Sequence, residues 1–236
     1  MKGIITRILM VDSSKVIGKY FRPLLSVLVV KTTNGESCFT LNRNDISGSP
    51  VFDVQKATFS PKGTFLVTWS RPLTSKGIAE GTSFPNNLHI WHLQSGRLAS
   101  SFTQKTFKAD TIQWIADESY CFRLVTNEIH VLTCKFDVVT EASRSDENFL
   151  LENKVYHKGV AHFRVAPKAT NSSVGIAIFE PEHGGKPGRV SLYEYSLPKK
   201  EVSGPLCSRT IFGASEVSSD QIYHFHSTLV YCSLFV

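Results

Sequence analysis

One repeated unit limits the possible folds of this chain more than any other feature. It consists of a strand, a tight turn and a second strand, and a third strand follows after a loop. Residues 57–70 read ATFSPKGTFLVTWS, and residues 86–91 read NNLHIW. Pro61 presets the backbone angle φ of the turn, and Gly63 accepts the positive φ that closes it. The aromatic and branched residues on either side favour strands. The unit predicts one antiparallel sheet, with strands at 54–59, 65–69, 88–93 and 98–102.

The same order of elements recurs twice along the chain. A second copy runs from Ile112 through a turn at 116–119 to strands at 120–124 and 129–133, and a third has strands at 160–165, 174–179 and 190–195. The second strands centre near Val67, Phe122 and Ala177, which gives a period of about 55 residues. Such sheets have two apolar faces, which radial stacking buries. The repeats predict an all-β fold, a partial WD40-like β-propeller of about three to four blades of a larger propeller.

The repeats divide the chain into three parts. Residues 1–23 form a poorly defined N-terminal segment with one possible strand at 4–11, and residues 24–217 form the partial propeller, which opens with a hairpin around Asn34-Gly35. Residues 218–236 form a divergent tail that lacks the turn motif. We therefore expect a truncated or variant form of a longer protein. The loop at 71–87, rich in Pro, Thr, Ser and Gly, is expected at the surface, where propellers place specificity.

The charge is mildly basic, with a formal net charge of +6 and a pI near 9.1. This is compatible with RNA or ribosome contact, and equally with solubility alone. Loops of one kind gather on one rim of a propeller, so scattered basic residues can combine into a basic face or remain a solvated surface. The residues concerned are Lys105, Lys108, Lys154, Lys158, Lys186, Arg189, Lys199 and Lys200. No apolar stretch is long enough for a membrane span.

The sequence predicts no catalytic, cofactor-binding or metal-binding residues. His89 and His92 point to opposite faces of a strand, while His224 and His226 share a face but have no Cys or carboxylate ligand spaced with them. The five cysteines show no pairing pattern and are expected to be free thiols. No G-x-S-x-G motif occurs, His130 is expected to be a hydrogen-bonded blade residue, and Asp117-Glu118 is expected to form a turn. The chain is therefore not expected to be an enzyme.

The glycine-rich segment 182–189, EHGGKPGR, is similar to a phosphate-binding loop at first sight. It lacks the spacing of that motif, and Val190 opens a strand rather than a helix, so no helix N-terminus faces an anion. We expect a flexible connection between strands. Such a connection could still present Lys186 and Arg189 to RNA phosphate.

These motifs together resemble the family of eukaryotic translation initiation factor 2A. The segments that carry the resemblance are FSPKGTFLVTW at 59–69, LTSKG at 73–77, FPNNLHIWHLQSG at 84–96, WIADE at 114–118 with Cys121, Arg123 and NEIH at 127–130, and RVSLYEY at 189–195. The match covers roughly residues 27–217 and is most specific at 57–130. Members of the family are more than twice as long, with a nine-bladed propeller and a basic helical extension.

The resemblance implies a cytoplasmic translation initiation factor that acts by binding. Its partners would be the small ribosomal subunit, initiator methionyl-tRNA and mRNA, with other initiation factors possible, and without GTP hydrolysis, a membrane or a small-molecule substrate. It assigns no RNA-contacting residue in this chain. Two alternatives stay open: a ribosome-binding propeller similar to that of the B subunit of initiation factor 3, and a generic WD-repeat scaffold for protein–protein interaction.

Overall fold

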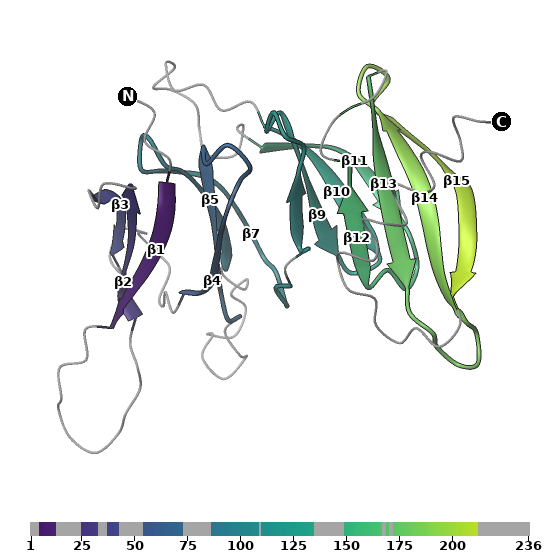
Figure 1. Cartoon of the computed structure of the whole chain (residues 1–236), viewed down its shortest axis with the longest axis horizontal. Coiled ribbons are helices and arrows are strands. Elements are labelled where there is room, and N and C mark those ends of the chain that lie inside the picture. The colour runs from purple at the N-terminus through teal and green to yellow at the C-terminus, as the bar shows by residue number, and fades with distance from the viewer. Residues whose placement is uncertain are drawn as a thin grey trace, which may run out of the picture. The chain divides into compact units, whose positions relative to one another are not determined.

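The computed structural model describes residues 5–12, 25–32, 37–42, 54–72, 86–108, 110–134, 149–166, 169 and 172–211, the first three segments by their backbone alone. These residues form fifteen β-strands in four antiparallel sheets (Figure 1). The strands divide between two compact units, β1 to β7 in one and β8 to β15 in the other. No helix in these ranges is long and apolar enough to cross a membrane.

The first unit contains two sheets. One has three strands in the order β1-β2-β3, and the other has four in the order β4-β5-β6-β7. Their bounds are β1 Ile5–Asp12, β2 Leu25–Thr32, β3 Ser37–Asn42, β4 Val54–Phe59, β5 Phe65–Ser70, β6 Leu88–His92 and β7 Arg97–Phe102. The strand expected at 4–11 is therefore present as β1. It pairs with β2, which adds a third strand to the hairpin predicted from Asn34-Gly35.

The turn between β4 and β5 is held by a buried serine. The Ser60 hydroxyl accepts a hydrogen bond from Phe65 N at 2.9 Å, and the Ser60 carbonyl accepts one from Gly63 N at 2.9 Å. Gly63 has a φ of 72°, the left-handed value that the turn motif predicts. Between β6 and β5, Trp91 Nε1 donates a hydrogen bond to Thr68 Oγ1 at 2.9 Å. These bonds satisfy polar groups inside the sheet and fix its register.

The second unit contains two four-stranded sheets, ordered β11-β10-β9-β8 and β12-β13-β14-β15. Their bounds are β8 Ile112–Trp114, β9 Tyr120–Val125, β10 Glu128–Cys134, β11 Phe149–Tyr156, β12 His162–Val165, β13 Ser173–Glu180, β14 Gly188–Ser196 and β15 Glu201–Ile211. A single apolar core joins the two sheets, with Phe122, Ile129 and Val131 on one side and Ile176 and Tyr195 on the other. Successive four-stranded meanders packed face to face are the arrangement of neighbouring propeller blades.

The outer strands β11 and β15 were not expected from the sequence. The centre of β11, Glu152-Asn153-Lys154, is polar, and β15 contains Gly204-Pro205, which normally argues against a strand. Both are outermost strands of their sheets, where a missing backbone donor is tolerated, although β11 still buries Phe149 and Val155. The exposed large hydrophobic residues of the described surface lie on these strands: Leu150, Leu151, Tyr156 and Leu206.

Gly204 is also required by a close approach between β14 and β15. A Cβ atom at Gly204 would lie 2.9 Å from Tyr193 Cδ1, and its φ of 134° is unfavourable for other residues. The register shifts between Leu192 and Glu194, so Tyr193 stands at an irregularity in the pairing. This local geometry places the Tyr193 ring against the backbone of β15.

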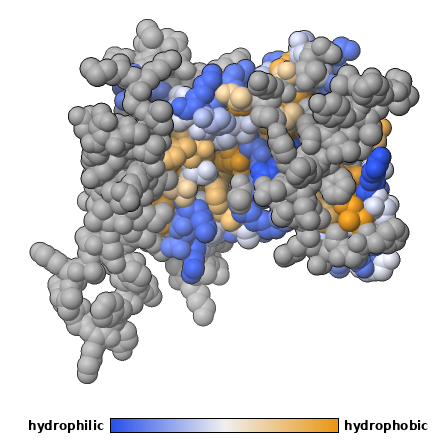
Figure 2. Space-filling view, viewed as in Figure 1, coloured by the Kyte–Doolittle hydropathy of each residue, from blue (hydrophilic) through white to orange (hydrophobic). Residues whose placement is uncertain are grey.

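The fold is all-β and has the organisation of a partial WD40-like β-propeller, as the repeats predicted. The described surface mixes hydrophilic and apolar side chains, as Figure 2 shows for one face. The specificity loop expected at 71–87 lies outside the described residues except at its ends, and so does the tail at 218–236. The division into segments 1–23, 24–217 and 218–236 stays a prediction.

Candidate nucleic-acid interface

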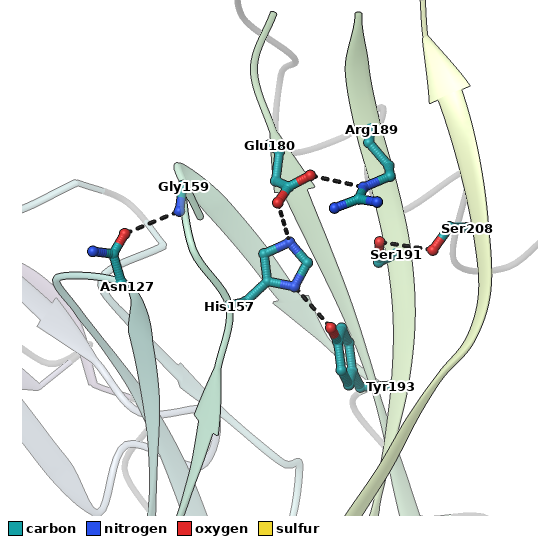
Figure 3. A network of polar contacts seen from close by, with 8 residues as sticks. All are labelled: Asn127, His157, Gly159, Glu180, Arg189, Ser191, Tyr193 and Ser208. Carbon is teal, nitrogen blue, oxygen red and sulfur yellow. Dashed lines mark hydrogen bonds and ion pairs between the residues drawn. The ribbon is translucent and has the colours of Figure 1, made fainter. Parts of the chain in front are cut away.

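Three strand connections of the second unit meet at one end of its two sheets (Figure 3). They are the β9–β10 turn, the β11–β12 connection and the β13–β14 hairpin loop. Asn127 Oδ1, in the first, accepts a hydrogen bond from Gly159 N at 2.9 Å, and the Asn127 carbonyl accepts one from His157 N at 2.9 Å. Asn127 itself has a φ of 60°, a conformation that asparagine tolerates. These bonds hold the β11–β12 connection in place.

The β13–β14 loop is a tight hairpin. His183 and Lys186 form a β-bridge, with hydrogen bonds of 3.1 Å in both directions. Gly184 and Gly185 between them have φ values of 59° and 75°, the two positive angles that a type I′ turn requires. The segment predicted as a flexible connection is thus a connection between strands, and its tip has a defined turn geometry.

A chain of four side chains crosses this end of the unit. Glu180 and Arg189 are cross-strand partners on β13 and β14, and Arg189 Nε donates to Glu180 Oε2 at 2.8 Å. His157 Nε2 lies 2.8 Å from Glu180 Oε1, although its N–H is not aligned for a linear hydrogen bond. His157 Nδ1 lies 2.8 Å from the Tyr193 hydroxyl. The chain of contacts therefore runs Tyr193–His157–Glu180–Arg189 (Figure 3).

Burial decides the protonation of the central histidine. It lowers the pKa of His157 from its ordinary value, and this outweighs the opposing influence of the Glu180 carboxylate. A neutral ring with its proton on Nε2 faces Glu180 and accepts at Nδ1 from the Tyr193 hydroxyl. Burial raises the pKa of Tyr193, which keeps that hydroxyl protonated. The hydrogen bond with Glu180 raises the pKa of Arg189, so the guanidinium stays charged.

An open groove of about 720 Å³ lies beside this chain of contacts. Its lining includes Lys158 from the β11–β12 connection, Lys186 from the hairpin, and Arg189. All three cations are exposed to solvent. The lining also includes two carboxylates, Glu180 and Glu182, of which Glu180 is already bound to Arg189 and His157. Three cations against two carboxylates leave the groove with one net positive charge.

The predicted basic face is only partly assembled. The structure brings Lys158, Lys186 and Arg189 to one groove. Lys154 instead pairs with Glu128 at 3.2 Å, and Lys200 pairs with Glu152 at 2.9 Å. The remaining predicted cations, Lys105, Lys108 and Lys199, are exposed on other connections. The sequence missed His157, Glu180 and Tyr193, because three separate elements supply them and no local motif marks them.

The other polar candidates have structural surroundings. His89 and His92 are both buried on β6, and His92 Nδ1 lies 2.8 Å from Ser95 Oγ. His130 Nε2 contacts Glu128 Oε2 at 2.9 Å, as expected for a hydrogen-bonded blade residue. Ser119 N donates to Asp117 Oδ1 at 2.9 Å in the turn that Asp117-Glu118 predicted.

The described side chains offer no cluster of metal ligands. Within that part of the chain, no three His, Cys, Asp or Glu residues are grouped as a metal site would need, and Cys121, Cys134 and Cys207 are free thiols. His224 and His226 lie outside it.

Comparison with known proteins identifies the relatives of this chain. It is 31% identical over 168 residues to eukaryotic translation initiation factor 2A of Schizosaccharomyces pombe, a match that covers 71% of this chain and 26% of that protein. The same factor of Dictyostelium discoideum is 27% identical over 146 residues, covering 61% of this chain and 21% of the relative. The chain is a relative of eukaryotic translation initiation factor 2A. No protein-family model matches it.

A solved structure of an initiation factor is also similar to this chain. A crystal structure of a eukaryotic initiation factor superposes with a TM-score of 0.58 at 28% identity, covering 82% of this chain and 41% of the other. The B subunit of eukaryotic translation initiation factor 3 from Neosartorya fischeri is 27% identical over 207 residues, covering 72% of this chain and 26% of that protein. The chain thus spans about a quarter of the length of its curated relatives. The predicted resemblance to factor 2A is confirmed.

Proposed function

We propose that this chain binds the small ribosomal subunit together with initiator tRNA or mRNA, as a cytoplasmic translation initiation factor of the 2A type. The observation that carries the proposal is the 31% identity to factor 2A across 71% of the chain. The net charge of +6 supports it, since binding to nucleic acid draws on phosphate neutralisation. The groove lining contributes three exposed cations to that charge.

The proposed role is assistance by binding, without catalysis or a cofactor. The series of contacting side chains Tyr193–His157–Glu180–Arg189 orients a guanidinium and contains no Ser, Cys or Thr nucleophile. Its histidine contacts a carboxylate and a phenol, in a buried position. This arrangement suits recognition of an anion better than bond cleavage.

A protein-binding scaffold is the second candidate function. It is favoured by the exposed apolar residues of the outer strands, namely Leu150, Leu151, Tyr156 and Leu206. Exposed strand edges of this kind can pair with a further strand. A partner bound in this way would be held by apolar and backbone contacts, which depend little on salt.

Co-sedimentation with purified small ribosomal subunits tests the proposed function. We expect the purified chain to sediment with the subunits at low salt and to be released as salt increases, because phosphate contacts weaken steeply with ionic strength. Failure to sediment at low salt would contradict ribosome binding. Sedimentation that is insensitive to salt would favour the scaffold function.

A further inference from the structure

We propose that the groove between the β11–β12 connection and the β13–β14 hairpin binds the phosphate backbone of RNA, with Arg189, Lys158 and Lys186 as its contacts. The inference rests on the proposed function and names the site through which RNA would be held. The groove offers cations from two different connections within one open space of about 720 Å³. A backbone that crosses it would meet all three.

Arg189 is positioned for bidentate recognition. Its Nε is bound to Glu180 at 2.8 Å, and Glu180 is held from its other oxygen by His157. The two terminal nitrogens of Arg189 have no partner among the described residues, and the side chain is 50% exposed. A guanidinium fixed through Nε presents its terminal nitrogens as a fork that matches two phosphate oxygens.

The rest of the contact chain makes His157 a positioning residue. Its ring is fixed between Glu180 and the Tyr193 hydroxyl, and Tyr193 is fixed by the close approach of Gly204. The orientation of Glu180, and with it that of Arg189, is therefore set by contacts within the protein before any ligand arrives. Preorganisation of this kind lowers the entropic cost of binding.

The two lysines of the groove supply positive charge that is not held in an ion pair with a described residue. Lys158 and Lys186 are exposed, and neither forms an ion pair with a described residue. Lys186 follows directly on the two glycines of the hairpin turn, so its backbone position is fixed by the β-bridge to His183. Glu182 is the remaining carboxylate of the lining, and it leaves the groove with a net positive charge.

The test measures binding of a fluorescently labelled oligouridylate to the full chain by anisotropy. The double variant Lys158→Ala/Lys186→Ala is expected to lose affinity by about tenfold at low salt, and its log–log salt slope is expected to fall by about 1.4, two contacts of about 0.7 each. The control Lys62→Ala/Lys199→Ala removes the same charge from two other exposed turns. It is expected to bind like the unchanged chain.

A second variant separates the geometry of Arg189 from its charge. Arg189→Lys keeps the positive charge and removes the fork, so we expect a several-fold loss of affinity with the salt slope unchanged. If the circular dichroism spectrum of Arg189→Lys also changes, its loss of affinity would be assigned to altered folding. The affinity of His157→Gln, a variant that leaves Arg189 in place, then tests the proposal. Under the proposal that variant also binds more weakly at an unchanged slope.

Competition identifies the ligand class. Unlabelled single-stranded and duplex RNA are expected to displace the probe, and their relative strength shows which form of the backbone the groove accepts. Displacement by polyglutamate at equal charge concentration, as strong as that by RNA, would overturn the proposal in favour of an acidic protein partner. Equal losses in the groove variant and the control would overturn it as well. If the groove variant still sediments with small subunits like the unchanged chain, only this site fails; if neither sediments, the proposed function fails.

Discussion

At the scale of single residues, burial has a larger influence than charge pairing on the pKa values of four histidines, His89, His92, His130 and His157. His89 is 3% exposed on β6, and burial lowers its pKa from 6.5 to about 4. The pKa values of His92, His130 and His157 are lowered by burial in the same direction. At neutral pH these rings are therefore neutral, and each acts as a hydrogen-bonding or packing group.

The lowered pKa of His89 makes stability depend on pH. In the unfolded chain the His89 ring is protonated near pH 6.5, whereas in the folded chain it is protonated only near pH 4. The stabilisation is therefore complete above about pH 6.5 and is lost as the pH falls toward 4, by at most about 3 kcal/mol. Urea unfolding at several pH values measures this loss. In His89→Asn the slope with pH is expected to be shallower than in the unchanged chain.

The exposed His183 gives a matched control for His89. His183→Gln also removes one imidazole but from the hairpin tip, and it should leave the pH profile as it is in the unchanged chain. If His89→Asn and the unchanged chain lose stability in parallel below pH 6.5, the buried His89 is not the source of the dependence.

At the scale of elements, the β4–β5 turn contains a buried serine and the β8–β9 turn contains an exposed one. Ser60 is 3% exposed and exchanges hydrogen bonds with the backbone of Phe65, whereas Ser119 bonds to Asp117 at the surface. A buried backbone group that loses its partner is costly, while an exposed one finds water. The two serines should therefore differ in their contribution to stability.

Alanine substitution of the two serines tests this difference. Ser60→Ala leaves the buried Phe65 N–H without its partner, and we expect the free energy of unfolding to fall by about 1–3 kcal/mol. Ser119→Ala is expected to change it by less than about 0.5 kcal/mol. Denaturant titration of both variants supplies the comparison, and similar losses in the two would show that burial of the turn is not what matters.

The sequence predicted the outer strand β7 as well as the inner strands, but it missed the outer strands β11 and β15 for a physical reason. Inner strands such as β5 and β13 are buried on both faces, so their apolar runs stand out. The outer strands β11 and β15 are largely exposed and include polar residues and Pro205, so composition gives them a weak strand signal. The sequence also showed the cations of the groove, as scattered residues. It could not show the Glu180–Arg189 contact, which depends on strand register, or the His157–Tyr193 contact, which depends on a second connection.

At the scale of the whole molecule, each compact unit has its own core. In the second unit, the Phe122 ring on β9 is fully buried, and its centroid lies 6.3 Å from that of Tyr195 on β14. The two four-stranded sheets thus share one apolar interface. In a repeat architecture, the stability of a sheet depends on the interface with its neighbour as well as on its own strands.

Truncation of this aromatic side chain tests the shared core. Phe122→Ala is expected to destabilise the second unit by about 3–5 kcal/mol, since it leaves a cavity between the two sheets. Hydrogen exchange should then show lost protection in β13 and β14 as well as in β9 and β10, while β5 and β6 keep theirs. Loss confined to the sheet that contains Phe122 would mean that the two sheets are stable independently.

Ultraviolet crosslinking with peptide mapping tests most directly whether this chain contacts RNA on the small ribosomal subunit through the groove beside the β13–β14 hairpin. The full chain is bound to purified small subunits at low salt and irradiated, and the crosslinked peptides are identified by mass spectrometry. We expect RNA adducts on the peptides that contain Lys158 and residues 182–189. Adducts confined to peptides elsewhere, such as those around Lys62 or Lys199, or no RNA adduct on a chain that sediments with the subunit, would contradict it.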